Sequence, residues 1–452
     1  MNAQAVATPP MQLDATEAAR RTLYRRAVEA AVWAMPVVGV EAMRQAYFSD
    51  ARATYNDILF WSRAGGWKNQ TPTPDPVSCQ VYFNFNTKCG PVVFIAPPGG
   101  GLSGSIFDAW QVPVAGVGAG DALPAGERRY VLLPPGHAGP VPAGYVPVRL
   151  QTFNGYAMLR VAPAGVDAAA LRAALDTVRQ LQVHPLSEAA LPPRQRFVDM
   201  TGRLFDGVVP FNERLYAHLA RMLSEEPALQ RDAAVLGGLR GLGIEPGGDF
   251  RPDAVTRAHL RRAATDAQAI VTGRGATGGV VFWPGFHWRS PGPVAARRGF
   301  SLMANARPDA GGRTEFRFFA ASPPATPGVT TFSLSTYFDG AGHRLGGEHT
   351  YHLRVPACVP AERRWSAAVY DAGTGAFIRE SPRAAVDSHG TLERNADGSV
   401  DLCFGPEPRA CYESNWIYTA PGRPWFTIFR FQGPEAPLFE KTWWMGDVER
   451  VR

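Results

Sequence analysis

Short runs of β-branched and aromatic residues, broken every few positions by glycine or proline, constrain the fold of this chain most strongly. They occur first between about residues 58 and 161, as in Gln80–Phe85 and Tyr156–Val161. They return from about residue 278 onward, as in Thr331–Phe338 and Trp425–Phe431. Short strands between turn residues are typical of antiparallel sheets. The sequence therefore predicts a mainly β protein with α-helical parts, containing two antiparallel β-rich domains of sandwich or jelly-roll type.

Two other stretches have helical periodicity. Apolar residues recur at helical spacing from Glu17 to Ala34 and from Val40 to Phe48, and Pro36 is expected to separate two helices. Residues 166–277 repeat alanine and leucine at the same spacing. The expected organisation is a flexible leader at 1–14, N-terminal helices and a β domain at 15–165, a helical linker or insertion at 166–277, and a C-terminal β-sandwich domain at 278–452.

Charge and cysteine content exclude several classes of protein. All but three of the 46 basic residues are arginine, but they are scattered rather than clustered along one stripe, so we expect no nucleic-acid partner. The five cysteines have no CxxC spacing, which argues against zinc. Cys79 with Cys89, or Cys403 with Cys411, could pair if their strands are adjacent; otherwise they are small buried side chains.

Membrane and export signals are not apparent in the chain. No run reaches the roughly 20 apolar residues that a membrane span needs, and the N-terminus lacks a basic region followed by an apolar one. We expect a cytoplasmic protein as given, with a small-molecule substrate, no membrane partner and a possible homo-oligomeric state.

An ordered series of motifs resembles a pair of bacterial domain families. The N-terminal half resembles DUF1254, and the residues that carry this resemblance are Ala34–Pro36, Trp67–Thr71, Gly104–Gln111, Leu133–Gly136 and Thr152–Ala157. The C-terminal part resembles DUF1214 through Trp365–Asp371, Asn395–Asp401, Glu413–Trp416, Phe429–Phe431, Gly433 and Pro434. The resemblance implies two β-rich domains bridged by helices, often in oligomers, usually with no metal or organic cofactor. It implies no particular activity, and many members of the family are exported.

The chain departs from the family pattern at one motif. Where relatives typically read Thr-Pro-Asn-Thr-Asp-x-Ile-Tyr, this sequence has Asp75 to Tyr82, which places Val77 and Cys79 at the usual Asn and Asp. If that polar pair carries the family's chemistry, this member has lost it or replaced it with a thiol. A specialised member, for instance from a biosynthetic pathway, fits this departure.

Three residues are candidates for catalysis. Asp108 precedes Trp110, and a carboxyl beside an indole can have a raised pKa and act as an acid. His287 lies between Phe286 and Trp288, where an imidazole could act as acid or base. Cys79 could be a nucleophile if a base lies within reach. The structural alternatives are a turn-capping aspartate, a core histidine and a small buried side chain.

Further aromatic and polar residues are candidates for binding a substrate. Arg430 could bind an anionic group, or could instead form a salt bridge within the domain. The other candidates are Trp67, Tyr82, Trp110, Trp288, Arg383, Asn415 and Trp416. Eleven tryptophans would suit a deep apolar pocket, and we expect one between the two β domains, with Asp108 and His287 pointing into it.

These expectations lead to one function and two alternatives. The first is an enzyme without a cofactor that uses acid–base chemistry, for cyclisation, isomerisation or hydrolysis, on a mostly apolar small molecule. The second is a non-catalytic ligand-binding or assembly protein. The third is a thiol hydrolase that uses Cys79.

Overall fold

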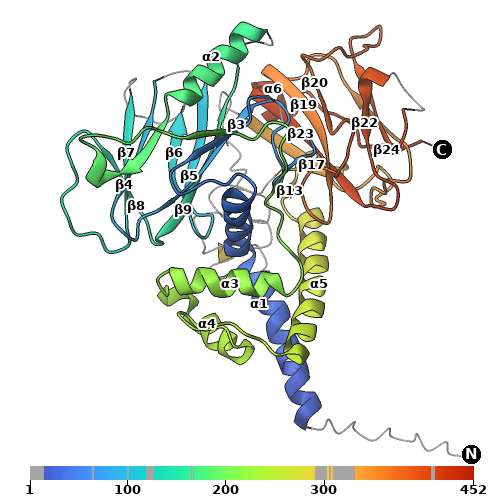
Figure 1. Ribbon diagram of the computed structural model, residues 1–452. Helices are drawn as coiled ribbons and strands as arrows, with labels where there is room; N and C mark the ends of the chain where they lie inside the picture. Colours follow the sequence, from blue (N-terminus) through green and yellow to red (C-terminus); the bar gives the residue numbers. More distant parts are fainter. Residues whose placement is uncertain are drawn as a thin grey trace, which may run out of the picture.

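The computed structural model describes residues 15–451 apart from 64–65, 99–100, 119–126, 164, 166, 291–302, 305–306, 309–330 and 409–412, so the leader expected at 1–14 lies outside the described residues. Two β lobes lie side by side, and a group of helices lies beneath them (Figure 1). The prediction of a mainly β protein with two antiparallel β-rich domains, an N-terminal helix and helices between the domains is confirmed.

The N-terminal lobe is a sandwich of two sheets. Phe83 of the larger sheet lies 5.1 Å from Phe94 of the smaller one, ring centroid to ring centroid, within their shared apolar core. In order across the larger sheet, the strands are β11 (Phe197–Asp199), β1 (Ile58–Phe60), β3 (Cys79–Asn86), β9 (Asn154–Val161), β5 (Leu102–Asp108) and β6 (Pro113–Gly118). The smaller sheet has β10 (Gln182–Pro185), β4 (Val92–Ala96), β7 (Arg128–Leu133) and β8 (Val146–Arg149).

This lobe extends beyond the expected boundary at residue 165. After α2 (Ala168–Arg179), β10 pairs with β4 and β11 pairs with β1, and β12 (Phe205–Asp206) pairs with β2 (Asn69–Gln70). Asp167 caps α2 by accepting a hydrogen bond from the Ala170 backbone N–H. The stretch after 166 therefore begins inside the β domain, because these short returning strands follow a helix whose periodicity dominates the local pattern. A 3₁₀ turn (Leu186–Glu188) follows β10.

The helices beneath the lobes pack around α1 (Ala15–Ser49), which is one helix and not the two that Pro36 was expected to separate. The expectation fails because residues 34–38 are all buried, so packing holds the helix through the proline. Gln111 donates a hydrogen bond to Pro36 O at 2.9 Å. The other helices are α3 (Arg214–Glu225), α4 (Ala233–Leu239), α5 (Ala254–Thr277) and two 3₁₀ turns (Gln230–Asp232 and Arg240–Leu242).

Alternation along β3 ties the helices to the sandwich. Phe83 points into the sandwich core, whereas its neighbour Tyr82 points to the opposite face and joins the core formed with α1, α3 and α5. The Tyr82 ring lies 5.9 Å from Tyr47 of α1. The larger sheet is therefore covered on both faces.

The C-terminal lobe is a second sandwich. Its larger sheet contains β13 (Val280–Val281), β14 (Arg289–Ser290), β17 (Thr331–Thr336), β23 (Trp425–Pro434), β19 (Ala361–Asp371) and β20 (Ala385–Asp387). Its smaller sheet contains β22 (Trp416–Tyr418), β21 (Val400–Gly405), β18 (Tyr351–Val355) and β24 (Glu449–Arg450). Trp425 lies between the sheets, with the rings of Tyr351 and Phe404 5.5 and 5.1 Å away. The remaining elements are β15 (Met303–Ala304) paired with β16 (Arg307–Pro308), a 3₁₀ turn (Glu413–Asn415) and α6 (Ala436–Phe439).

Segment 70–78 of the first lobe lies against the outer face of the larger C-terminal sheet, and we call this contact the interdomain seam. Thr73 N donates to Gly375 O at 2.7 Å, and the Tyr370 hydroxyl donates to Pro74 O at 2.8 Å. Gln70 donates to Phe377 O at 3.0 Å. These buried hydrogen bonds join the two lobes directly.

Candidate functional site

An oriented imidazole lies in the turn between β13 and β14. His287 Nδ1 lies 2.8 Å from Asp447 Oδ2, and the His287 backbone N–H donates to Asp447 Oδ1 at 2.9 Å. The Asp447 side chain is 5% exposed, whereas the imidazole is 33% exposed. A buried carboxylate that accepts two hydrogen bonds from one residue fixes the orientation of that residue's ring and favours the tautomer with a proton on Nδ1.

We call His287 and Asp447 the dyad. The residues around it explain how the fold fixes its position. Trp288 is fully buried, and its indole N–H donates to Gly446 O at 2.8 Å, directly before Asp447. Phe338 lies beside the imidazole, with 6.0 Å between ring centroids. Phe286 contacts Trp444, whose side chain is 57% exposed, so aromatic surface surrounds the exposed part of the site. Within the described part of the chain, His287 Nε2 has no hydrogen-bond partner, which leaves it available to exchange a proton.

Asp447 could not be found from the sequence. It lies 160 residues from His287, and no local motif marks it. The aromatic setting of His287 was visible in the sequence, and Trp288 was a candidate for substrate contact. The structure instead buries Trp288 beneath the dyad, where it anchors residues 446–447.

Asp108 lies in a different core from His287. Its Oδ1 accepts hydrogen bonds from the backbone N–H groups of Trp110 and Val112, at 2.8 and 2.9 Å, in the turn between β5 and β6. Its neighbours Phe107 and Ala109 pack in the helical core, whereas Trp283 and Trp288 pack in the C-terminal sandwich. The structure does not bring the two predicted acid–base residues into one chamber, and the position of Asp108 matches the turn-capping alternative.

Cys79 begins β3 at the interdomain seam and is 2% exposed. Burial, followed by the charges of Asp199 and Asp75, raises the pKa of its thiol to about 11. A thiol with this pKa is almost entirely protonated at neutral pH, so it lacks the thiolate that a nucleophile needs. Cys79 and Cys89 are both free thiols, which excludes a disulfide between them. Cys403 is disulfide-bonded, and Cys411 lies outside the described residues.

Three predicted substrate contacts are structural links within the C-terminal lobe. Arg383 donates to Glu413 O and Ser414 O, and the Asn415 amide donates to Glu393 O and Asp401 O. The Trp416 indole donates to Gly405 O at 2.9 Å. These side chains hold backbone carbonyls around the 3₁₀ turn that precedes β22, so they act as links within the lobe.

The other predicted substrate contacts lie in cores or at the seam. Tyr82 is fully buried, and Trp110 is 3% exposed and contacts Trp33 at 5.1 Å between ring centroids. Trp67 is half-buried against the apolar face of the C-terminal sheet. Arg430 extends from that face into the seam, where it donates to Thr73 O. The structure therefore brings Arg430 and the segment that leads to Cys79 together, away from His287.

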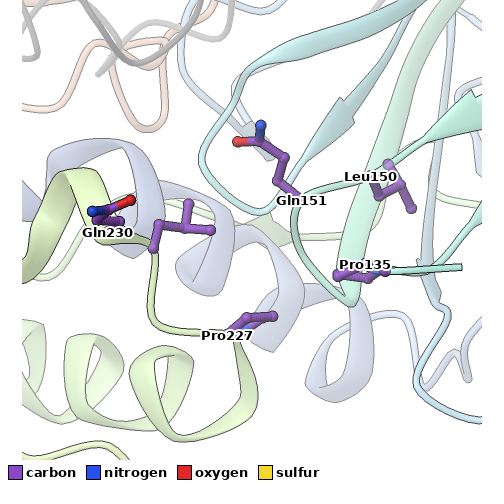
Figure 2. Close-up of a pocket in the computed structure, with 7 residues that line it drawn as sticks. Pro135, Leu150, Gln151, Pro227 and Gln230 are labelled. Atoms are coloured by element: carbon purple, nitrogen blue, oxygen red, sulfur yellow. The ribbon is translucent and has the colours of Figure 1, made fainter.

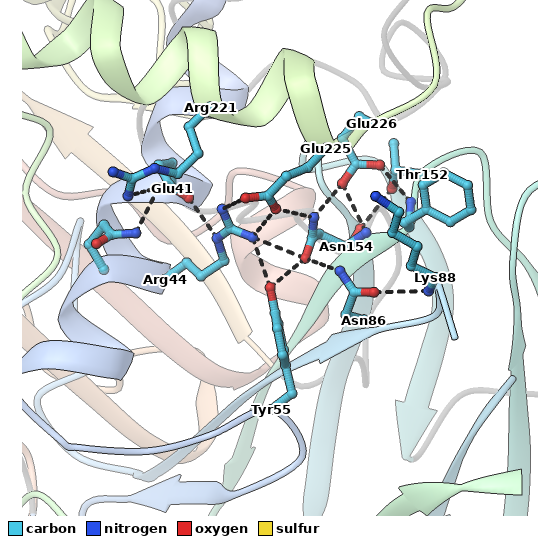
Figure 3. Close-up of polar contacts among 12 residues, drawn as sticks. Glu41, Arg44, Tyr55, Asn86, Lys88, Thr152, Asn154, Arg221, Glu225 and Glu226 are labelled. Atoms are coloured by element: carbon cyan, nitrogen blue, oxygen red, sulfur yellow. Dashed lines mark hydrogen bonds and ion pairs between the residues drawn. The ribbon is translucent and has the colours of Figure 1, made fainter. Parts of the chain in front are cut away.

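A dense polar network joins α1, α3 and the start of β9 (Figure 3). Arg44, which is 3% exposed, pairs with Glu41 at 2.6 Å and bonds both carboxylate oxygens of Glu225. The amide of Asn154 bonds both Glu225 and Glu226. The network is completed by Tyr55, Asn86, Thr152, Lys88 N–H and Arg221. Its members come from five separate segments, so no local sequence pattern indicated the network.

Glu226 lies at the end of this network, and its carboxyl group has a raised pKa. It accepts hydrogen bonds from the backbone N–H groups of Phe153 and Asn154, at 2.6 and 2.9 Å, and is 8% exposed. Burial is the largest effect and raises the pKa of Glu226 to about 7; the charge of Glu225 acts in the same direction, against the N–H donors. The group can therefore change its charge near neutral pH.

A surface pocket of about 410 Å³ lies beside the network (Figure 2). It is formed by the loops around β7, β8 and β9 and by the chain that follows α3. Its lining residues are Pro135, Gly136, Leu150, Gln151, Pro227, Leu229 and Gln230. No titratable side chain is among them, so this pocket is not the chamber with acid–base groups that the sequence led us to expect.

The described residues contain neither a cluster of metal ligands nor a membrane-spanning helix. Within those ranges, no group of three or more His, Cys, Asp or Glu side chains could hold a metal ion. No helix there combines the length and apolar character needed to cross a bilayer.

Two solved structures from bacteria were matched to the chain. The VPA0106 protein from Vibrio parahaemolyticus has a TM-score of 0.54 and 16% sequence identity, over 95% of this chain and 100% of that one, so the two proteins share a fold. A protein from Burkholderia cenocepacia has a TM-score of 0.41 and 12% identity, over 96% of both chains. No curated protein matches the chain.

Two family models match the chain in the order that the motifs indicated. Residues 55–185 match DUF1254, and residues 330–436 match DUF1214; both families are described as proteins of unknown function. The first match covers most of the N-terminal sandwich, and the second covers most of the C-terminal one. The chain therefore belongs to the family whose members join an N-terminal DUF1254 domain to a C-terminal DUF1214 domain.

Proposed function

We propose that this protein is an enzyme that moves protons with its own side chains, through His287 and Asp447, on a mostly apolar small molecule. The observation that carries the proposal is the dyad: a buried carboxylate holds Nδ1 of a partly exposed imidazole whose Nε2 has no hydrogen-bond partner among the described residues. An imidazole in this arrangement is suited to accept a proton at Nε2 and return it, with Asp447 stabilising the imidazolium that forms in between.

The surroundings of the dyad favour an apolar substrate. Phe286, Phe338 and exposed Trp444 provide aromatic surface next to the imidazole. Removal of a proton from one atom and its return at another leads to isomerisation. It leads to cyclisation if the deprotonated atom forms a ring bond and the proton goes to the atom that receives the displaced electron pair, and activation of a water molecule leads to hydrolysis. All three reactions need only the side chains of this site. Asp108 is no longer part of the proposal, because its carboxylate caps a turn in another core.

The test compares small-molecule extracts of the organism that encodes the protein after incubation with wild-type protein and with His287→Gln. Liquid chromatography with mass spectrometry would show compounds that change mass or retention time. His343→Gln is a matched control, because His343 is exposed and lies near another aspartate of the same lobe, with 3.6 Å between Nδ1 and Asp339 Oδ1. We expect conversion by the wild type and by His343→Gln, but not by His287→Gln. Conversion by all three proteins, or by none, would refute the proposal.

The alternative of a non-catalytic binding or assembly protein is favoured by one observation. Both sandwiches are filled by their own side chains, and the pocket in Figure 2 is open to the surface with no titratable lining. If no compound is converted, a compound that instead co-purifies or raises the melting temperature would support this alternative. The thiol-hydrolase alternative is disfavoured by the protonated, buried state of Cys79.

A further inference from the structure

The interdomain seam contains a buried arginine that has no carboxylate partner. Arg430 of β23 is 6% exposed. One guanidinium nitrogen, Nη2, donates to Thr73 O at 3.2 Å, and the group lies 5.4 Å from the ring centroid of Tyr370. The other, Nη1, is buried and has no hydrogen-bond partner among the residues that the structure describes. A buried guanidinium is costly unless an anion or a full set of acceptors compensates for the lost water.

The carboxylates near the seam lie within ion-pair distance of other arginines, although Asp75 Oδ2 has no hydrogen-bond partner among the described residues. Asp75 Oδ2 lies 3.8 Å from Arg160 Nη1, and Asp387 Oδ1 lies 3.7 Å from Arg364 Nε. Asp75 also accepts a hydrogen bond from the Val77 backbone N–H, which holds its carboxylate in the turn. The described part of the chain therefore offers Arg430 no ion pair of its own.

A second unsatisfied donor lies beside Arg430. Ser366 of β19 is directly opposite Arg430 in the antiparallel pair, so both side chains leave the same face of the sheet. Ser366 is 1% exposed, and within the described ranges its hydroxyl has no hydrogen-bond partner. Buried polar groups without partners are rare in folded proteins, and a bound water or ion is one of the explanations for them.

We propose that the seam binds a small carboxylate, with one oxygen on Arg430 Nη1 and the other on the Ser366 hydroxyl. A carboxylate supplies the negative charge that Arg430 lacks and has two oxygens, which suit two neighbouring donors. Thr73 O keeps Nη2 in place, so the guanidinium is already oriented. The site is separate from the His287 dyad and does not depend on the proposed enzymatic function. A carboxylate bound there would contact residues of the C-terminal sheet directly beneath the segment of the first lobe.

The test measures the melting temperature of the full chain by differential scanning fluorimetry near pH 7.5. Sodium acetate replaces sodium chloride at constant ionic strength, and sodium phosphate is a parallel arm. We expect the melting temperature to rise with acetate concentration in the wild type. Because the lost interactions are charge-assisted, Arg430→Met should weaken acetate binding about tenfold or more, and Ser366→Ala should weaken it by a smaller factor.

The matched control is Arg354→Met, in the same lobe. Arg354 pairs with Asp397 at 2.7 Å on the surface, so this substitution removes an exposed arginine and should leave the acetate response unchanged. Absence of an acetate-specific rise in the wild type would overturn the proposal, as would an equal rise in Arg430→Met. A larger response to phosphate that is lost in Arg430→Met would overturn the assignment to carboxylates.

Discussion

The carboxyl of Glu226 makes the stability of the joint between α3 and the first lobe depend on pH. Its pKa is about 7 in the folded protein, against 4.5 for an ordinary glutamate. A group with a raised folded pKa contributes stability that is fully present below the unfolded pKa and is lost as pH rises through the folded pKa. The difference corresponds to about 3 kcal/mol of unfolding free energy, lost between about pH 4.5 and pH 7.

His218 of α3 opposes this effect in the same pH range. Burial first, and the charges of Arg214, Arg221 and Arg44 after it, lower the pKa of His218 to about 4. A histidine with a lowered pKa makes the folded protein lose stability as pH falls from about 6.5 towards 4, because only the unfolded chain binds the proton there. The wild-type curve alone would therefore hide the contribution of Glu226.

The informative assay is urea unfolding of the wild type and Glu226→Gln from pH 4 to 8. We expect the free energy of unfolding of the wild type, relative to the variant, to fall by about 3 kcal/mol as pH rises across this range. Glu225→Gln is the matched control, because the hydrogen bond and charge of Arg44 overcome burial and lower the pKa of Glu225. The free energy of unfolding of the wild type, relative to Glu225→Gln, should therefore rise with pH instead of falling. If the wild type instead gains stability relative to Glu226→Gln as pH rises, burial is not the dominant effect on the pKa of Glu226.

Three further outcomes follow from buried groups elsewhere. Iodoacetamide should label exposed Cys89 and Cys358 but not buried Cys79 in the folded protein, and rapid labelling of Cys79 detected by peptide mass spectrometry would contradict its burial. Arg44→Met should lower the free energy of urea unfolding by about 3–5 kcal/mol, because it removes the buried cation shared by Glu41 and Glu225 and leaves Glu41 with only the half-exposed Arg221; a loss below about 1 kcal/mol would contradict this. Gly347→Ala should lower the melting temperature more than Gly346→Ala, since its new Cβ would lie 1.9 Å from the Ala420 backbone oxygen, whereas the neighbouring Cβ meets the movable Glu348 side chain.

The architecture was predictable because it depends on patterns that repeat locally. Short runs of β-branched and aromatic residues between turn residues, such as Gln80–Phe85, indicated antiparallel sheets, and Gln80–Phe85 lies within β3 of such a sheet. The ordered motifs indicated the paired DUF1254 and DUF1214 family, which the matches at 55–185 and 330–436 confirm. The continuous helix through Pro36 was not predictable, because distant residues bury that segment from all sides.

The site residues were harder to predict because they depend on contacts between distant segments. The sequence showed that His287 lies among aromatic residues, but its partner Asp447 lies in a segment without a recognisable motif. Arg430 was a candidate for binding an anionic group, but its hydrogen bond to Thr73 O depends on how the two lobes pack against each other. Asp108 was misleading because a carboxylate next to a tryptophan has the same local sequence whether it caps a turn or lines a site.

The most direct test of the proposed chemistry is the rate at which Asp447→Asn converts a compound that the wild type transforms. An asparagine at this position keeps the side-chain size but cannot stabilise the imidazolium or favour the same tautomer, so we expect kcat/KM to fall by a factor of about 10² to 10⁴. Circular dichroism would verify that the variant is folded. A folded Asp447→Asn protein with the wild-type rate would contradict the assignment of His287 and Asp447 as the proton-transfer dyad.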